Sequence, residues 1–166
     1  MVELNVLIGG VIGFVSALGM EEYKRFIAEK EKSKTLKRLL VLLYEEVEQI
    51  SELLSIDLKN FEMCCGSGLD NHDKLHEKER IESVIKRLKH NHIIYESQSE
   101  RLLTIPSYLP NSLIRFHTRL AVNTDKMLDL LKIEDEEKLK EIINLSSIES
   151  ESLKKDIKDQ IDKIKS

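Results

Sequence analysis

Apolar residues recur at helical spacing along most of this chain. Four runs repeat every three or four positions, which is the pattern of a helix with one buried face. The first run comprises Leu36, Leu40, Leu43, Val47, Ile50, Leu54 and Phe61, and it is widened by Leu39 and Leu53. The others are Ile81, Val84, Ile85, Leu88, Tyr95 and Leu102; Leu113, Phe116, Leu120, Met127 and Leu131; and Leu139, Ile142, Ile143, Leu153, Ile157, Ile161 and Ile164. These runs predict four amphipathic helices.

Glycine and proline divide these helices. Beyond residue 20 they occur only at Gly66, Gly68, Pro106 and Pro110. The second helix is expected to carry its apolar face as far as Leu102 but to fade through residues 97–99. Ile105, Tyr108 and Leu109 are expected to pack onto the bundle, and the third helix to start near residues 111–112. Asn123-Thr124-Asp125 is a candidate kink in that helix. The fourth begins at the acidic run 134–137, and its polar middle, residues 146–152, predicts loose packing.

Short links between four amphipathic helices favour an all-α fold, an antiparallel bundle of about four helices. The same apolar stripes would also serve an intermolecular coiled coil. The sequence does not separate these two arrangements.

The N-terminal segment differs from the rest because residues 4–20 carry no charge. A helix of that length rises about 25 Å, at the short end of what a bilayer requires. The segment therefore predicts a transmembrane anchor over residues 1–21. A signal peptide and a buried helix are the alternatives. No Lys or Arg precedes the apolar run, which disfavours a signal peptide, and the lack of a polar face disfavours an interfacial helix.

Basic residues follow the anchor and predict its orientation. Lys24, Arg25, Lys30 and Lys32 lie after the apolar run, and none lies before it. The positive-inside rule then places the N-terminus outside and the bundle in the cytoplasm, as in a single-pass protein of the bacterial inner membrane. The reverse topology is the alternative. The expected organisation is an anchor over 1–21, a charged stalk over 22–35 and a bundle over 36–166.

Two features predict how the anchor behaves. Gly9, Gly13 and Ala17 are four residues apart and form a strip of small residues that favours close helix packing, and hence a homo-oligomer. Nothing between Met20 and Met63 stops a helix. Anchor, stalk and first bundle helix are therefore expected to form one rod of roughly 60 residues.

Composition and motifs argue against several function classes. The net charge of −4 does not favour a nucleic-acid partner. Cys64, Cys65, His72 and His76 could supply zinc ligands, but adjacent cysteines lack the usual gap between ligands, so no metal is expected. His90-Asn91-His92 lacks the strands of a metal-dependent nuclease. No phosphate-binding loop or nucleophile elbow is present, so we expect neither enzymatic activity nor a cofactor.

One basic section remains as a candidate ligand or partner face. Arg80, Lys86, Arg87 and Lys89 lie together in the second predicted helix. They could meet a phosphate group or the acidic face of a cytoplasmic protein. The alternative is a solvated face balanced by Glu79 and Glu82.

The chain combines an uncharged N-terminal run, a charged stalk, the segment Leu39–Ile50 and a later Leu102-x-x-Ile105-Pro106-x-x-Leu109 segment. This layout resembles a broad set of uncharacterised bacterial and phage proteins. The resemblance implies one membrane helix and a helical cytosolic domain, and it brings no functional residues. We expect a membrane-tethered interaction or scaffold protein. The alternative is an oligomeric membrane effector, of the antiviral defence or phage-exclusion type, whose cytosolic domain senses a ligand or partner and perturbs the membrane.

Overall fold

The computed structural model describes the backbone of residues 2–64, 71–91, 93–105 and 108–164. It describes the side chains of 19–55, 75–91, 93–98, 100–105 and 108–164. Within these residues there are six helices and no strand, which confirms the all-α prediction. The helices are α1 (Val2–Cys64), α2 (Asn71–His90), α3 (Ile93–Ser97), α4 (Ser99–Leu102), α5 (Leu109–Ile133) and α6 (Glu136–Lys163).

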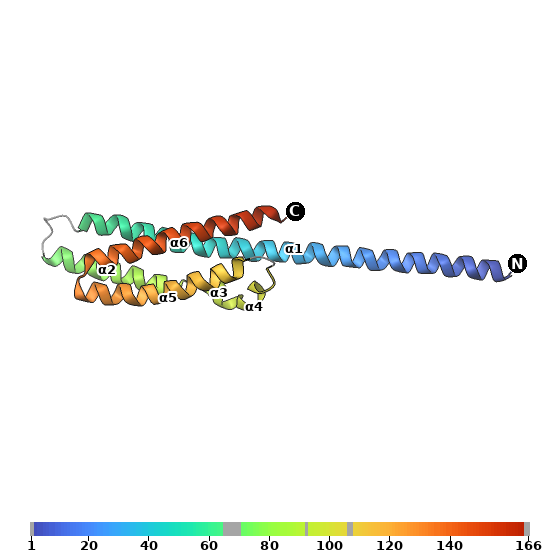
Figure 1. Ribbon diagram of the computed structural model, residues 1–166, viewed down its shortest axis with the longest axis horizontal. Helices are drawn as coiled ribbons and strands as arrows, with labels where there is room; N and C mark the ends of the chain where they lie inside the picture. The colour runs from blue at the N-terminus through green and yellow to red at the C-terminus, as the bar shows by residue number, and fades with distance from the viewer. Residues whose placement is uncertain (1, 65–70, 92, 106–107, 165–166) are drawn as a thin grey trace.

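Helix α1 is a single rod of 63 residues, or about 95 Å at the usual rise per residue. Figure 1 shows its C-terminal half inside the bundle and its N-terminal half projecting alone. The prediction of one unbroken helix is confirmed. No residue between Met20 and Met63 is a glycine or proline, so nothing in the sequence interrupts its backbone hydrogen bonds.

The bundle consists of the C-terminal half of α1 with α2, α5 and α6. Helix α1 packs against α2 and α6, and α5 packs against the same two helices. Successive long helices run in opposite directions (Figure 1). The chain therefore forms an antiparallel four-helix bundle on its own, which is the first of the two arrangements that the sequence left open.

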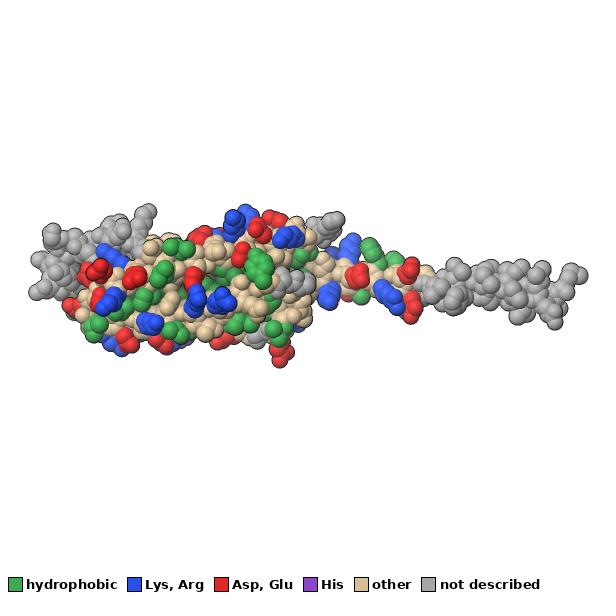
Figure 2. All heavy atoms as spheres, viewed as in Figure 1, with side chains coloured by type: hydrophobic (Ala, Val, Ile, Leu, Met, Phe, Trp, Pro, Cys, Tyr) green, Lys and Arg blue, Asp and Glu red, His purple; other side chains and the backbone are tan. Residues whose placement is uncertain are grey.

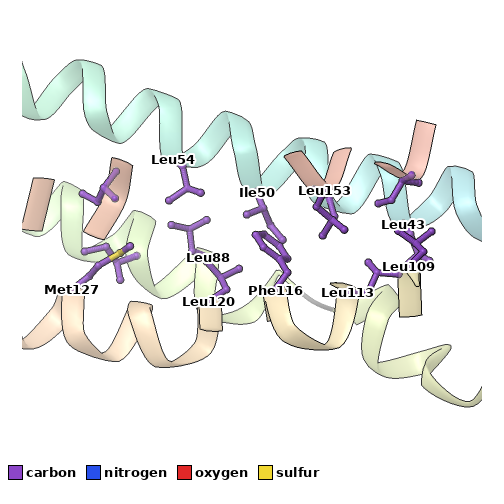
Figure 3. Close-up of a cluster of buried hydrophobic side chains, with 14 of the residues drawn as sticks. Leu43, Ile50, Leu54, Leu88, Leu109, Leu113, Phe116, Leu120, Met127 and Leu153 are labelled. Carbon is purple, nitrogen blue, oxygen red and sulfur yellow. The ribbon is translucent and has the colours of Figure 1, made fainter. Parts of the chain in front are cut away.

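The core is built from the four predicted stripes. Figure 3 shows leucine, isoleucine, phenylalanine and methionine side chains converging between the helices. Those under 2% exposed include Leu40, Leu43, Ile50, Leu54, Ile85, Leu88, Leu102, Leu109, Leu113, Met127, Leu139 and Ile143. Leu36 and Leu53 are only partly buried at the edge of this cluster. Phe61 lies outside the described side chains. Contact among these side chains provides most of the stabilisation of a helical bundle.

The middle of α6 corrects the expectation of loose packing. Ser146 and Ser150 are 1% and 0% exposed and lie in the core. Ser150 Oγ donates to the backbone carbonyl of Ser147 at 2.8 Å, and Ser146 Oγ accepts from Asn123 Nδ2 of α5 at 3.0 Å. With these hydroxyls hydrogen-bonded, burying them carries little penalty. Small side chains also leave room for the neighbouring helices to approach closely.

Replacement of Ser150 by leucine is expected to lower the free energy of unfolding by about 1–3 kcal/mol, because a larger side chain overpacks a filled position. The matched control is Ser152→Leu, since Ser152 lies on the same helix and is exposed. Urea unfolding followed by circular dichroism measures both. Equal effects of the two substitutions would show that Ser150 does not lie in a packed core.

The connection from α2 to α5 also differs from the prediction. The second helix was expected to fade only at residues 97–99, but α2 ends at His90 and two short helices follow. Leu102, Ile105 and Leu109 are buried as expected, whereas Tyr108 is 57% exposed. Helix α5 begins at Leu109 and continues without a break past residues 123–125, the candidate kink. Asp135 caps the start of α6, because its side chain accepts a hydrogen bond from the backbone N–H of Lys138.

Candidate functional site

The structure describes three places that bear on function: the stalk, the basic section of α2 and a buried polar cluster. The stalk, residues 22–35, lies on α1 outside the bundle (Figure 2). Lys24, Arg25, Lys30 and Lys32 are all exposed there. No ion pair involves these four among the described side chains. Gly9, Gly13 and Ala17 of the predicted packing strip lie outside those side chains.

No helix in the described part of the chain carries an apolar stretch long enough to cross a membrane. Residues 1–18 of the predicted anchor lie outside the side chains on which that finding rests.

The basic section of α2 is largely neutralised within the fold. Arg80 pairs with Glu77 on the same helix. Lys86 Nζ lies 2.7 Å from Glu82, and this hydrogen bond is the main cause that lowers the pKa of the Glu82 carboxyl.

The two remaining cations of this section differ. Lys89 Nζ lies 2.6 Å from Asp125 of α5. Among the described side chains no carboxylate pairs with Arg87. The section therefore offers one uncommitted guanidinium, rather than four cations, to a ligand or partner.

A hollow of about 460 Å³ lies beside Arg87, between α1 and α2. It is lined by Gln49, Glu52, Leu53, Arg87, His90 and Asn91. A second hollow, of about 610 Å³, shares Arg87 and His90 and is otherwise lined by α2 residues alone. His90 Nδ1 lies 2.7 Å from the carbonyl oxygen of Lys86 and so is best read as its donor. Because the linings mix carboxylates with cations, neither hollow selects an anion by charge.

The most constrained polar group is Glu46 of α1, which sequence reasoning missed. Its carboxylate is 3% exposed, and Glu46 Oε2 accepts from the backbone N–H of Ile94 at 2.6 Å. Glu46 Oε1 accepts from the N–H of Tyr95 at 3.2 Å. These N–H groups open α3 and have no partner within that helix. The Glu46 carboxylate thus ties the α2–α5 connection to α1.

His117 of α5 completes this cluster. Its Nε2 lies 3.6 Å from Glu46 Oε1, and its ring stacks on Tyr95 with centroids 4.1 Å apart. Phe116 meets the same ring edge-on at 5.3 Å. Burial raises the pKa of Tyr95, with a smaller contribution from the charge of Glu96. Neither Glu46 nor His117 lines the two hollows, so this cluster acts as an internal clamp between α1, α3 and α5.

A signal for this cluster was present in the sequence. Glu46 stands three residues after Leu43 and four before Ile50, which places it on the core face of the first helix. His117 stands four residues after Leu113 in the same way. An acidic and a basic residue on facing apolar stripes favour a buried pair.

A second polar link joins α1 to α6. Buried Ser51 donates to the Glu151 carboxylate, and Lys154 Nζ lies 2.9 Å from the same oxygen. These two hydrogen bonds lower the pKa of Glu151 below its usual value. A depressed carboxyl pKa stabilises the fold above about pH 4.3, and this stabilisation is lost as pH falls through the lowered pKa.

Substitution Ser51→Ala is expected to reduce the free energy of unfolding by about 1 kcal/mol at neutral pH. The difference from the parent should shrink as pH falls, because the protonated Glu151 no longer gains from the hydroxyl. Urea unfolding at pH 7 and pH 3 measures this. Ser55→Ala is the control, since the Ser55 hydroxyl donates to the backbone carbonyl of Ser51 and not to a carboxylate among the described side chains. A difference that is unchanged with pH would contradict the link.

Among the described residues no group of three or more His, Cys, Asp or Glu is arranged to hold a metal ion. His76 is exposed and lies 3.8 Å from Glu79. Cys64, Cys65 and His72 lie outside the described side chains. Comparison of the chain with protein-family models, curated proteins and solved structures gave no match.

Proposed function

We propose that this chain is a membrane-tethered helical interaction protein without enzymatic activity. Residues 1–21 form the anchor, residues 22–35 the stalk, and residues 36–166 a bundle that presents its surface to a cytoplasmic protein. The observation that carries the proposal is the course of α1, which leaves the bundle and continues towards Val2 as a single helix.

The stalk supports the division into anchor, stalk and bundle. All residues from 19 to 35 except Ser33 are exposed, whereas Leu39 and Leu40 are buried. Towards the N-terminus the helix enters the uncharged run 4–20. A helix that carries no charge on any side favours an apolar environment, and a bilayer supplies it. The 14-residue stalk would hold the bundle about 20 Å from the membrane.

The test is membrane insertion of the full chain in bacterial cells. The parent is expected in the membrane fraction after an alkaline carbonate wash, while Val11→Lys shifts protein to the soluble fraction, because a lysine at mid-bilayer costs about 3 kcal/mol. Ala28→Lys, in the exposed stalk, is the matched control. A parent chain that is released by carbonate as readily as Val11→Lys would refute the anchor.

One observation favours the effector as a second candidate. Because α1 is continuous from Val2 into the core, displacement of the bundle would move the N-terminal segment as well. Membrane potential after overexpression separates the two candidates. Depolarisation that requires Gly9 and Gly13 supports the effector, and an unchanged potential with normal growth supports the tether.

A further inference from the structure

Residues 93–98, in the connection between α2 and α5, bury no side chain, although the chain is held firmly on both sides of them. They comprise α3 and Gln98, and each of their side chains is exposed or half-buried. Leu88 before them is 0% exposed and Leu102 after them is 1% exposed. Figure 1 shows α3 towards the end of the bundle from which α1 projects. The segment 93–98, here called the flap, is therefore fixed at its two ends and weakly packed between them.

Glu46 lies at the centre of the contacts that hold the flap against the bundle. Its carboxylate accepts from the backbone N–H groups of Ile94 and Tyr95, and hydrogen bonds to a charged acceptor are stronger than those between neutral groups. The ring of Tyr95 stacks on His117 beside the same carboxylate. Ile94 and Tyr95 also touch the core but are only partly buried there. The flap thus depends on one buried carboxylate in addition to limited apolar packing.

The flap is too short to keep its helical structure by itself. Helix α3 has five residues, and isolated helices shorter than about 12 residues are marginal in water. The four long helices depend less on the flap, because none of the buried hydrophobic side chains of the core belongs to it. Loss of the contacts to Glu46 would therefore release the flap and leave the core of the bundle in place.

We infer that the flap opens as a unit while the four-helix bundle stays folded, and that the Glu46 carboxylate is the latch that keeps it closed. Segments with few buried apolar contacts open at a lower free energy than the core they rest on. In the closed form Glu46 and His117 are 3% and 6% exposed. Opening admits water to both, so the flap controls access to a buried carboxylate and imidazole. The inference does not depend on the proposed anchor, because flap and latch both lie on the bundle.

Hydrogen exchange of the full chain in detergent, resolved to single amides by mass spectrometry, tests the opening. The N–H of Gln98 reports the flap, since it donates to the carbonyl of Ile94 at 3.0 Å. The N–H of Leu120, a buried residue of α5, reports the core. We expect protection at Gln98 to be at least roughly tenfold lower than at Leu120 and almost insensitive to low urea, because local opening exposes little surface. Equal protection and equal urea dependence at the two amides would overturn the inference.

Three substitutions separate the latch from the general stability of the bundle. Glu46→Gln weakens the acceptor and should speed exchange at Gln98 roughly tenfold. Glu45→Gln removes the neighbouring, exposed charge and should leave that rate unchanged. Leu139→Ala truncates a side chain that is 1% exposed at the start of α6, and α6 begins at the end of the bundle away from α3 (Figure 1). This substitution should speed exchange at Leu120 but not at Gln98, because the closed and open forms lose the same contact.

The latch and the flap are decided by different rates. An unchanged rate at Gln98 in Glu46→Gln refutes the latch. Equal acceleration of Gln98 and Leu120 in Leu139→Ala means that the segment opens only when the whole bundle unfolds, which refutes the flap. Faster exchange at Gln98 in Glu46→Gln, with no change there in Leu139→Ala, supports both.

Discussion

Replacement of Glu46 by alanine is expected to lower the free energy of unfolding by about 3–5 kcal/mol, the usual range when one partner of a buried ion pair is removed. The substitution removes the acceptor for the N–H groups of Ile94 and Tyr95 and leaves His117 buried without this carboxylate. Urea unfolding of the full chain in detergent, followed by circular dichroism, measures the change.

Two companions make this test specific. Glu45→Ala removes the neighbouring, exposed carboxylate and should change stability by no more than about 0.5 kcal/mol. Glu46→Gln keeps a carbonyl oxygen for α3 and should fall between the two. A double-mutant cycle with His117→Ala should show a coupling energy of the order of 1 kcal/mol or more. If Glu46→Ala is as mild as Glu45→Ala, the carboxylate does not clamp the connection.

The second large effect is expected at Leu43. Its side chain is fully buried and lies beside Leu109 and Leu113 of α5 (Figure 3). Truncation to alanine loses apolar burial and leaves a cavity, which together cost about 2–5 kcal/mol. Leu42 is the adjacent leucine and is 44% exposed, so Leu42→Ala should cost about 0.5 kcal/mol or less.

Thermal unfolding of the two alanine variants under the same conditions ranks them directly. The Leu43 variant should melt several degrees below the Leu42 variant. Equal melting temperatures would mean that the buried face of α1 has been assigned wrongly. The ranking is a sensitive check because both substitutions remove the same atoms from the same helix.

Local pattern was sufficient for much of the architecture. Leu40, Leu43, Val47 and Ile50 recur at helical spacing, and the structure buries all four. The unbroken α1 followed from the absence of a helix breaker between Met20 and Met63. Such features depend on residues within a turn or two of each other, so they can be read along the chain.

The candidate sites were harder to predict. The basic section of α2 was correctly placed on a helix, but the pairing of Lys89 with Asp125 links residues on different helices. No local rule gives that contact. The anchor strip and the orienting lysines remain predictions.

The sequence by itself determined the helical class, the number of long helices and the apolar faces that meet in the core, because these follow from side-chain periodicity. Only the tertiary structure decided where α2 stops and why Ser150 is buried. Glu46 of α1 reaches the start of α3, about 50 residues later, and Ser150 is fully buried within the bundle. Such contacts depend on how whole helices are placed in space, which local periodicity does not encode.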